Sequence, residues 1–568
     1  MSHIDLECSS CSHRISYIRP WNACPQCGNA WFEARYPYAD LRRGLAALRQ
    51  RPFNMWRYRD LLPLRDDANI VSMGEGGTPL VRLDNLALMM GRPHLFAKDE
   101  RQGPTGSFKD RQASLAVSVM KENGVGEVVV ASTGNVAISY SAYCARAGIK
   151  LWAFMNSTVA AEKMREVALY GTEVVKVTGT YDEAKDVAAT FAERKSLHLD
   201  KGIRSFAARE GMKTIAYETC EQLGALYGPE VPDSPVPMRA PHWYFQAISG
   251  GLGPVGVWKG FEELREMGLI QRMPRLACIQ AEGCAPIVKA FRAGLEKPED
   301  VLVPQTRIIT LATGKPGIAY TALRRAVLAS NGVMETATDG EGFRAMHVMA
   351  KMDGISMEPA TGVTFAGLFK LISAQVVKPD DIVVVNCSGH TLPVTEDLLD
   401  EGWARSIALD QPAGQAAPAL APQQAAGPFQ GDGLLAALDR LDERVKSVAI
   451  IDDDPNAVRL LKRILQARGQ YLLHEAHSGK EGLDLVRRER PDMVLLDLMM
   501  PDLDGFGVLA AMKEEEALRD IPVIVVSAKE LTPDERRRLA GQVRMLLQKA
   551  TFDDQDLLDD IQAALDNG

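Results

Sequence analysis

Lys109 is the residue of this sequence best placed for covalent chemistry. It follows a turn rich in Gly and small hydroxyl residues, Gly103–Ser107, and precedes a segment of helical character, Arg111–Ala116. A lysine in this position has an anchored backbone and a side chain that can reach a ligand. Its amine could form a Schiff base with an aldehyde cofactor. Most lysines at helix starts are solvated surface residues, so this prediction needs support from other segments.

Two further segments pair a strand with a turn that could bind an anion. The first is the apolar run Val128–Ala131, which reads as a buried strand. Its turn consists of Ser132, Thr133, Gly134 and Asn135. Backbone N–H groups and small hydroxyls in such a turn suit a substrate carboxylate, and the Asn135 amide can bond a ring hydroxyl. The second is Trp243–Ile248, which leads into the glycine-rich loop Ser249–Pro254. Such a loop can close on a phosphate or simply connect a strand to a helix.

Seven ordered segments resemble the threonine synthase family, which belongs to the tryptophan-synthase-β-like (fold type II) pyridoxal phosphate enzymes. They are Gly74–Leu80, the Lys109 segment, Ala131–Asn135, the glycine loop, Gln280–Gly283, Glu358–Ala360 and Cys387–His390. The resemblance covers roughly residues 36–405. It implies that Lys109 carries the cofactor and that Asn135 bonds its 3-hydroxyl. The residues implied around the cofactor phosphate are Gly250, Gly251, Leu252 and Gly253.

The resemblance also implies that the Ser388 hydroxyl faces the pyridine nitrogen. A carboxylate there would keep the ring nitrogen protonated, whereas a hydroxyl leaves it largely neutral. A neutral ring stabilises a carbanion less deeply. It therefore suits elimination and replacement at the substrate side chain better than transamination, with Lys109 moving protons.

The segments that grip the substrate phosphate in threonine synthases match only in part. The family usually has a hydroxyl residue directly after the asparagine, and an Asn-Ser pair and an Arg before a Glu-Gly-x-Lys-Thr run. Here Val136, Gly202–Ile203 and Ala208 occupy those positions. Arg204 and Arg209 could substitute, but a shift of one residue on a helix turns a side chain by about 100°. The sequence therefore defines the cofactor site better than the substrate.

Four cysteines near the N-terminus have the spacing of a zinc ribbon. They are Cys8, Cys11, Cys24 and Cys27, in two Cys-x-x-Cys pairs. Four thiolates fill the tetrahedral shell of Zn²⁺, so the site is predicted to be structural. Disulfides are the poorer alternative in a reducing compartment. We expect the ribbon to span residues 1–35, and many threonine synthases resemble this chain in carrying one.

Composition sets the broad class. The 568 residues carry a net charge of −9, and neither a signal segment nor an apolar run of spanning length is apparent. A cytoplasmic protein that binds neither nucleic acid nor membrane is expected. Residues 36–73 are rich in Arg and aromatics, but acidic residues are interleaved, and packing against the main domain is expected.

Strands alternate with helical segments from Leu80 onward, which predicts parallel α/β layers. The expected strands are Leu95–Lys98, Val128–Ala131, Lys150–Phe154, Glu173–Val177, Trp243–Ile248, Arg275–Gln280 and Asp381–Asn386. Asp182–Arg194 and Met212–Leu226 are expected to be covering helices. The fold class is thus α/β, with two α/β subdomains implied for residues 36–405. Residues 406–445, rich in Ala, Pro and Gln, are expected to be a linker with a short helix.

Residues 446–568 resemble a response-regulator receiver domain, a doubly wound, flavodoxin-like fold. Apolar strands end in acidic residues that should meet at one sheet edge, where a divalent cation would offset their repulsion. Carried over from the family, Asp452 and Asp453 hold Mg²⁺ with Asp497, the phosphoacceptor. Ser527 and Lys549 assist the phosphoryl group. Ala550 in place of the usual proline and Leu546 in place of the switch aromatic depart from the family.

Together these segments predict a pyridoxal phosphate lyase that resembles threonine synthase, converting O-phosphohomoserine and water to threonine and phosphate. Phosphorylation by a histidine kinase or phosphotransfer protein is expected to regulate it. Two alternatives stay open: β-replacement or elimination on another hydroxy- or phospho-amino acid, and a non-catalytic amino-acid sensor. A homodimer is implied by the family alone.

Overall fold

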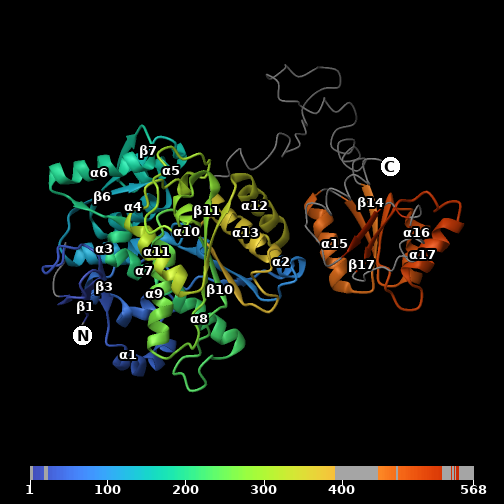
Figure 1. The fold of residues 1–568 in the computed structure, drawn as a ribbon, viewed down its shortest axis with the longest axis horizontal. Coiled ribbons are helices and arrows are strands. Elements are labelled where there is room, and N and C mark those ends of the chain that lie inside the picture. The colour runs from blue at the N-terminus through green and yellow to red at the C-terminus, as the bar shows by residue number, and fades with distance from the viewer. Residues whose placement is uncertain are drawn as a thin grey trace, which may run out of the picture. The chain divides into compact units, whose positions relative to one another are not determined.

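The computed structural model describes residues 4–17, 23–390, 446–468, 471–527, 539, 543 and 545–548. The chain forms two compact units, which divide after Val394 (Figure 1). Three of the sequence predictions lie outside the described residues: the linker 406–445, the role of Lys549 and the effect of Ala550.

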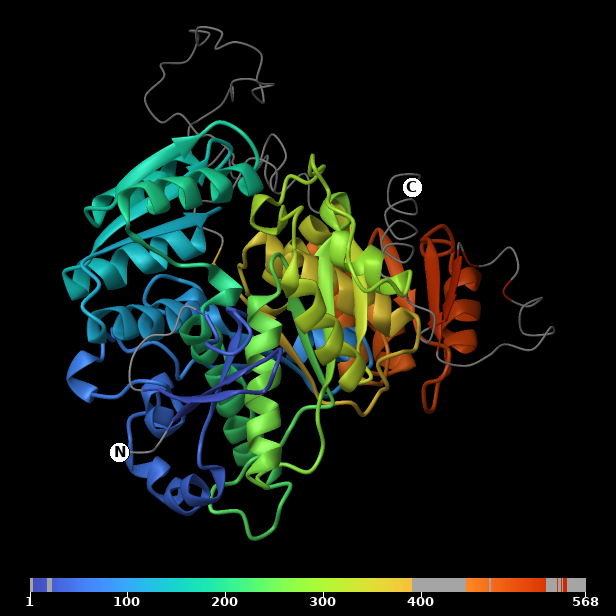
Figure 2. The same cartoon turned by 60° about the vertical axis from the view of Figure 1, so that its left-hand side comes forward.

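A small antiparallel sheet opens the first unit. Its order is β2-β1-β3, from Arg14–Ser16, Asp5–Cys8 and Phe32–Arg35. Leu6 pairs with Ala34, and both side chains are fully buried. Figure 2 shows these strands in blue against the green helix α9, Leu252–Glu266. The N-terminal sheet is therefore packed onto the larger domain.

The larger domain contains a six-stranded sheet of order β12-β11-β10-β13-β5-β4. In that order the strands are Val333–Ala337, Arg275–Ala281, Trp243–Ala247, Val383–Cys387, Leu95–Asp99 and Leu80–Arg82. All neighbours are parallel except β4, which pairs with β5 antiparallel. Mostly apolar and buried residues make the central strands β11, β10 and β13, as expected where helices cover both faces. The predicted strands in this sheet are confirmed to within about two residues at each end; β12 and β4 were not predicted.

A second, parallel sheet of order β8-β7-β6-β9 forms the other subdomain. Its strands are Glu173–Val177, Lys150–Asn156, Glu127–Ser132 and His198–Leu199. Alternate side chains of a strand face opposite sides of the sheet. Thus Val129 packs towards α6, whereas Val128 and Val130 pack towards α3 and α4.

The helices of the first unit cover these sheets (Figure 1). They are α1 Tyr38–Gly44, α2 Asp84–Met89, α3 Lys109–Glu122, α4 Asn135–Ala147, α5 Ala161–Leu169, α6 Tyr181–Lys195, α7 Phe206–Met212, α8 Thr214–Tyr227, α9, α10 Pro286–Arg292, α11 Ile318–Ala329, α12 Asp339–Asp353 and α13 Pro359–Ser373. The two expected covering helices, Asp182–Arg194 and Met212–Leu226, are confirmed as α6 and α8 to within about two residues at each end. Met212 ends α7, and α8 begins at Thr214, whose hydroxyl donates to the Gly211 carbonyl at 2.7 Å.

The segment between the small sheet and β4 packs as the sequence predicts. Tyr36 donates to Glu210 at 2.7 Å, and Tyr58 donates to Glu221 at 2.7 Å. Trp56 donates to Glu75, also at 2.7 Å. These aromatic residues are buried, and their polar atoms are satisfied by carboxylates of the first unit.

The second unit is a five-stranded parallel sheet of order β15-β14-β16-β17-β18. The strands are Tyr471–Ala476, Lys446–Ile451, Met493–Leu496, Val523–Ser527 and Met545–Gln548, and the helices are α15 Pro455–Arg468, α16 Gly479–Glu489 and α17 Gly505–Glu514. Strand order 2-1-3-4-5 is that of a flavodoxin-like, doubly wound fold. It places the ends of β14 and β16 side by side, and both strands lead into acidic residues.

Candidate active site and metal centres

A cavity of about 530 Å³ lies between the six-stranded and the four-stranded sheet of the first unit. Segments far apart in the sequence converge on it. The predicted site residues that line it are Lys109, Ser132, Thr133, Asn135, Gly250, Gly251, Leu252, Gly253 and Ser388. Gly134 belongs to the same turn. The structure thus brings together in one cavity the residues that the sequence assigned to cofactor and substrate.

Lys109 is the first residue of α3 and reaches the cavity from a rigid base. The backbone N–H of Phe108 donates to the Ser388 carbonyl at 3.0 Å, and Ser107 forms a β-bridge with Gly389. Desolvation lowers the pKa of Lys109 to about 8, against the opposing charge of Glu358. A substantial share of the amine is therefore neutral near physiological pH, as a nucleophile requires.

Arg111, two residues beyond the lysine, ties α3 to the domain. Its guanidinium is 1% exposed and binds two buried carboxylates: Nε lies 2.8 Å from Glu100, and Nη1 lies 2.6 Å from Glu218. Lys98 completes the cluster, with its Nζ 2.8 Å from Glu218. Bidentate pairs of this kind fix geometry as well as charge. This cluster holds the start of α3, and therefore the backbone of Lys109, in place.

Glu358 joins two of the predicted cofactor residues. The Asn135 amide donates to Glu358 Oε2 at 2.7 Å, and the Ser388 hydroxyl donates to Glu358 Oε1 at 2.6 Å. Thr361 Oγ1 lies 2.9 Å from Ser388 Oγ. Glu358 is 4% exposed and lines the cavity. The Glu358–Ala360 motif marked the family in the sequence, but only the tertiary structure shows that this carboxylate bridges Asn135 and Ser388.

The turn after β6 is preorganised by the hydroxyl of Ser132. This oxygen accepts from the N–H of Gly134 at 3.1 Å and from that of Ala137 at 3.0 Å. The hydroxyl is therefore used to shape the turn and to start α4. Thr133, Asn135 and Val136 line the cavity, which places the N-terminus of α4, a position that favours a carboxylate, at its wall.

The glycine loop sits at the N-terminus of α9. Gly251 has a φ of 75°, and a side chain on Gly253 would lie 2.3 Å from the Gln246 amide. A Cβ on Gly250 would meet nothing within 4 Å. The N-terminus of a helix of this length favours an anion. Gln246 Nε2, buried at this loop, has no hydrogen-bond partner in the part of the chain that the structure describes.

These features fit pyridoxal phosphate. The cavity offers a lysine amine of lowered pKa, an anion site at a helix N-terminus, an amide and a neutral hydroxyl. The Gln246 Nε2 group, which has no hydrogen-bond partner among the described residues, and the open space at Gly250 are consistent with a bound group beside the loop.

The substrate side of the cavity differs from the expected phosphate grip. Val136 and Ile203 line the cavity, and Ala208 is fully buried. Of the two arginines that could substitute for the missing one, Arg204 lines the cavity, whereas Arg209 is 1% exposed and points to the N-terminal sheet. Three further cations line the cavity, and no local pattern predicted them: Lys185, Lys201 and Lys315. They come from segments whose meeting is a tertiary feature.

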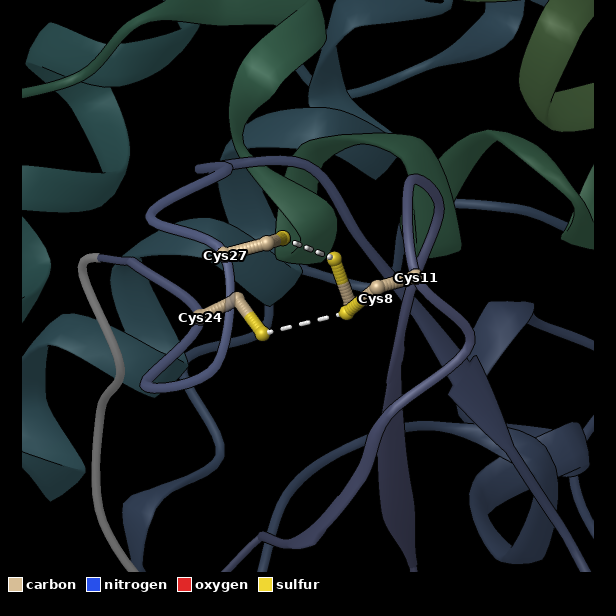
Figure 3. A group of neighbouring side chains, drawn as sticks. All are labelled: Cys8, Cys11, Cys24 and Cys27. Carbon is tan, nitrogen blue, oxygen red and sulfur yellow. Dashed lines mark hydrogen bonds between the residues drawn. The ribbon is translucent and has the colours of Figure 1, made fainter.

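The four N-terminal cysteines converge as their spacing predicts (Figure 3). Cys8 Sγ lies 3.5 Å from Cys27 Sγ, and Cys11 Sγ lies 3.6 Å from Cys24 Sγ. All four sulfurs lie within 4.8 Å of one another. Burial opposes ionisation of Cys8, but hydrogen bonds from the backbone N–H groups of Cys11 and Ser10 and from the thiols of Cys27 and Cys11 together lower the Cys8 pKa to about 6. Zn–S bonds of about 2.3 Å in a tetrahedron require a similar separation of sulfurs, so the group fits Zn²⁺.

The acidic residues of the second unit also converge. Carboxylate oxygens of Asp452, Asp453 and Asp497 lie within 4.8 Å of one another. Asp497 Oδ2 accepts from the backbone N–H of Met499 at 3.0 Å, and Asp452 Oδ1 accepts from that of Asp454 at 3.0 Å. Oxygen ligands in this arrangement suit Mg²⁺. Ser527 ends β17, next to the strand that leads into Asp497.

Known proteins match both units. Residues 71–389 match the model of the pyridoxal-phosphate dependent enzyme family, and residues 448–562 match that of the response regulator receiver domain. The chain is 37% identical to threonine synthase of Methanocaldococcus jannaschii over 374 residues, which cover 65% of this chain and 87% of that protein. It is 32% identical to threonine synthase of Methanosarcina acetivorans over 397 residues, which cover 70% and 93%. Diaminopropionate ammonia lyase of Escherichia coli matches with a TM-score of 0.49 and 15% identity, over 63% of this chain and 91% of that one.

The fold and the cavity define an enzyme-type α/β domain of fold type II, joined to a receiver domain. The chain belongs to the threonine synthase family of pyridoxal-phosphate-dependent enzymes. The family, the receiver domain and the fold class predicted from the sequence are thus confirmed. In the part of the chain that the structure describes, no helix is long and apolar enough to cross a bilayer.

Proposed function

We propose that this protein is a pyridoxal-phosphate-dependent carbon–oxygen lyase with threonine synthase activity. The observation that carries the proposal is the convergence of Lys109, Asn135, the glycine loop and Ser388 on one cavity. The names of its relatives and the lowered pKa of Lys109 support it. In this proposal Lys109 would bond the cofactor covalently, and the N–H groups around Gly250–Gly253 would hold its phosphate. Asn135 and Ser388, which Glu358 engages here, are its polar ring contacts.

The bound cofactor would supply an electron sink for negative charge at the substrate's reacting carbons. The chain's own residues then perform three tasks. The backbone N–H groups of Thr133 and Asn135, which line the cavity, would orient the substrate carboxylate, because the N–H of Gly134 already donates to the Ser132 hydroxyl. Lys109 Nζ moves protons at the substrate α-carbon and along the side chain, since a pKa of about 8 suits both acceptance and release of a proton. Arg204 and the cavity-lining lysines would bind the phosphate of O-phosphohomoserine.

Phosphate release from O-phospho-L-homoserine by the purified holoenzyme tests this function. Threonine must form in equal amount, because water replaces the phosphate in the same turnover. Phosphate release with no threonine, or no release at substrate concentrations up to the millimolar range, would refute the assignment.

Elimination or β-replacement on another hydroxy- or phospho-amino acid is the second candidate. It is favoured by Val136 and Ile203 in the cavity wall and by the engagement of Arg209 elsewhere. Together these changes remove several charge-assisted contacts to a substrate phosphate, each worth about 1.5 to 3 kcal/mol. Formation of 2-oxobutyrate from L-threonine, at a higher kcat/KM than phosphate release from phosphohomoserine, would select this candidate. Binding of amino acids without any turnover would instead indicate a sensor.

We propose further that the four cysteines hold structural Zn²⁺ and that Asp452, Asp453 and Asp497 hold Mg²⁺ for phosphorylation of Asp497. A histidine kinase or phosphotransfer protein would donate the phosphoryl group, and phosphorylation would regulate the enzyme. Ser527 and Lys549 would contact that group. We also propose a cytoplasmic location, a homodimer and domain boundaries at 1–35, 36–405, 406–445 and 446–568. Comparing kcat and KM before and after treatment with acetyl phosphate and Mg²⁺ tests the regulation; unchanged constants at full phosphorylation would refute it.

A further inference from the structure

Arg209 connects the N-terminal sheet to the larger domain through a buried guanidinium. Nη2 donates to the carbonyl of Phe32 in β3, and the guanidinium carbon lies 4.1 Å from the centroid of the Trp31 ring. Glu33 adds a carboxylate 3.7 Å from Nη2. The side chain is 1% exposed. Three consecutive residues at the N-terminal sheet thus surround one cation.

The other edge of the same guanidinium reaches the cavity wall. Nη1 donates to the carbonyl of Ile203, in the 3-10 turn Gly202–Arg204. Residues 199–204 all line the cavity, so the backbone that Arg209 holds is part of the wall facing the substrate. The turn has a second attachment, because the N–H of Gly202 donates to Asp200 at 2.8 Å, and the backbone N–H of Asp200 donates to the Val129 carbonyl of β6 at 3.0 Å. Arg209 is therefore the link of this turn to the N-terminal sheet, and Asp200 is its link to the sheet of β6.

The guanidinium suits such a connection. Its planar donor groups are fixed relative to one another, so the positions of two carbonyls bonded to opposite ends are coupled. A buried cation must also be satisfied, because desolvation is costly. Burial lowers the pKa of Arg209, and the charges of Glu33 and Glu210 oppose that shift. If β3 moved and the turn Gly202–Arg204 did not, the buried Arg209 guanidinium would lose one of its two carbonyl partners.

We infer that Arg209 is a positioning residue that makes the shape of the substrate-facing wall depend on the N-terminal sheet. The N-terminal sheet then does more than stabilise the fold, since the Ile203 end of the turn Gly202–Arg204 is held to it through Arg209. The inference rests on the proposed function only in that this wall contacts the amino-acid substrate. It also explains why Arg209 does not replace the missing phosphate ligand.

Lys259 provides a matched control. Its ammonium is also buried at the same interface, donating to the Ala34 carbonyl at 2.9 Å and pairing with Glu210. It lies on α9, and none of its hydrogen bonds or ion pairs with described residues involves the turn Gly202–Arg204. Arg209→Met and Lys259→Met both remove one buried cation that holds the N-terminal sheet, but only the first cuts the link to the cavity wall.

The experiment compares these variants as full-length holoenzymes. L-threonine and O-phospho-L-homoserine are titrated while the visible absorbance of the bound cofactor is followed, and Tm and zinc content are measured on the same samples. For Arg209→Met we expect Kd for the amino acids to rise about tenfold, the size of change that loss of one charge-assisted hydrogen bond can produce. The visible absorbance before any amino acid is added, and the zinc content, should stay unchanged. For Lys259→Met we expect Tm to fall about as much as for Arg209→Met, because each variant loses one buried cation. Its Kd should stay within about twofold of that of the parent protein.

Arg209→Lys guards against loss of folding in the first variant. It keeps the charge but cannot span both carbonyls, so Kd should rise by an intermediate amount. The inference is overturned if both arginine variants keep the parental Kd, or if Lys259→Met raises Kd as much as Arg209→Met does. The proposed function is tested by a separate assay, the formation of phosphate and threonine by the parent enzyme. The amino-acid Kd does not depend on which reaction follows binding, so the two proposals can fail independently.

Discussion

The pH dependence of cofactor capture by Lys109 is the sharpest test of the site. An ordinary lysine has a pKa near 10.4, so roughly one amine in 2,500 is neutral at pH 7. Burial in the cavity lowers the Lys109 pKa to about 8, which makes roughly one amine in ten neutral at that pH. Because only the neutral amine attacks an aldehyde, capture at pH 7 should be about 200 times faster than for a solvated lysine of equal intrinsic reactivity.

The assay mixes apoenzyme with pyridoxal phosphate between pH 6 and pH 10 and follows the visible absorbance of the product. The neutral fraction grows as pH rises, so the rate should increase about tenfold per pH unit at low pH and level off above about pH 8. A rate that keeps climbing at the same slope through pH 9.5 would show a solvated lysine and refute the reasoning.

The Glu358→Gln variant tests how the charge of Glu358 contributes to the pKa of Lys109. The negative charge of Glu358 favours the ammonium form of Lys109, so its removal should move the midpoint to lower pH and raise the capture rate at pH 7. Glu341→Gln is the control, because that carboxylate caps α12 and does not line the cavity. A midpoint that moves upward in Glu358→Gln, or that moves equally in both variants, would contradict the electrostatic account.

Three further predictions concern the metal sites and the cluster below the lysine. Cys27→Ser should lower bound zinc from about one ion per chain and lower Tm, measured by metal analysis and thermal unfolding, since a hydroxyl replaces a thiolate ligand. Asp497→Asn should abolish phosphoryl uptake from acetyl phosphate, measured by intact mass, because the nucleophile is gone. Glu218→Gln should destabilise the fold by about 3 to 5 kcal/mol in denaturant titrations, because Arg111 and Lys98 lose a buried counter-charge.

Each of these has a matched control in the same chain. Cys284→Ser changes a buried cysteine outside the N-terminal group of four and should keep zinc. Asp504→Asn alters the cap of α17 and should keep phosphoryl uptake. Asp84→Asn breaks an exposed pair with Arg82, worth about 0 to 1 kcal/mol at most. Each assignment is contradicted by one result. These results are zinc retained in Cys27→Ser, phosphoryl uptake retained in Asp497→Asn, and a loss of unfolding free energy in Glu218→Gln as small as in Asp84→Asn.

Local pattern was enough to predict most strands of the fold. Glu173–Val177 and Met493–Leu496 are apolar or alternating runs between turn residues, and both are strands with those bounds. Prediction was poorer where the local signal is mixed. Val333–Ala337 contains Glu and Thr and becomes a strand because it pairs with β11. No Pro marks the break between α7 and α8 in the sequence. The break occurs where Gly211 packs against the backbone of Arg111.

The sequence by itself determined the chemistry available to this protein: which amine could hold a cofactor, which thiols could share a metal and which carboxylates could meet. Those assignments depend on residue type and short spacing, which a linear chain already fixes. The tertiary structure alone decided which charges serve the fold and which face the cavity. Arg204 and Arg209 are five positions apart and chemically identical, yet one lines the cavity and the other is buried against Trp31. The physical reason is that desolvation and hydrogen bonding act between side chains brought together by packing, and no local pattern encodes that meeting.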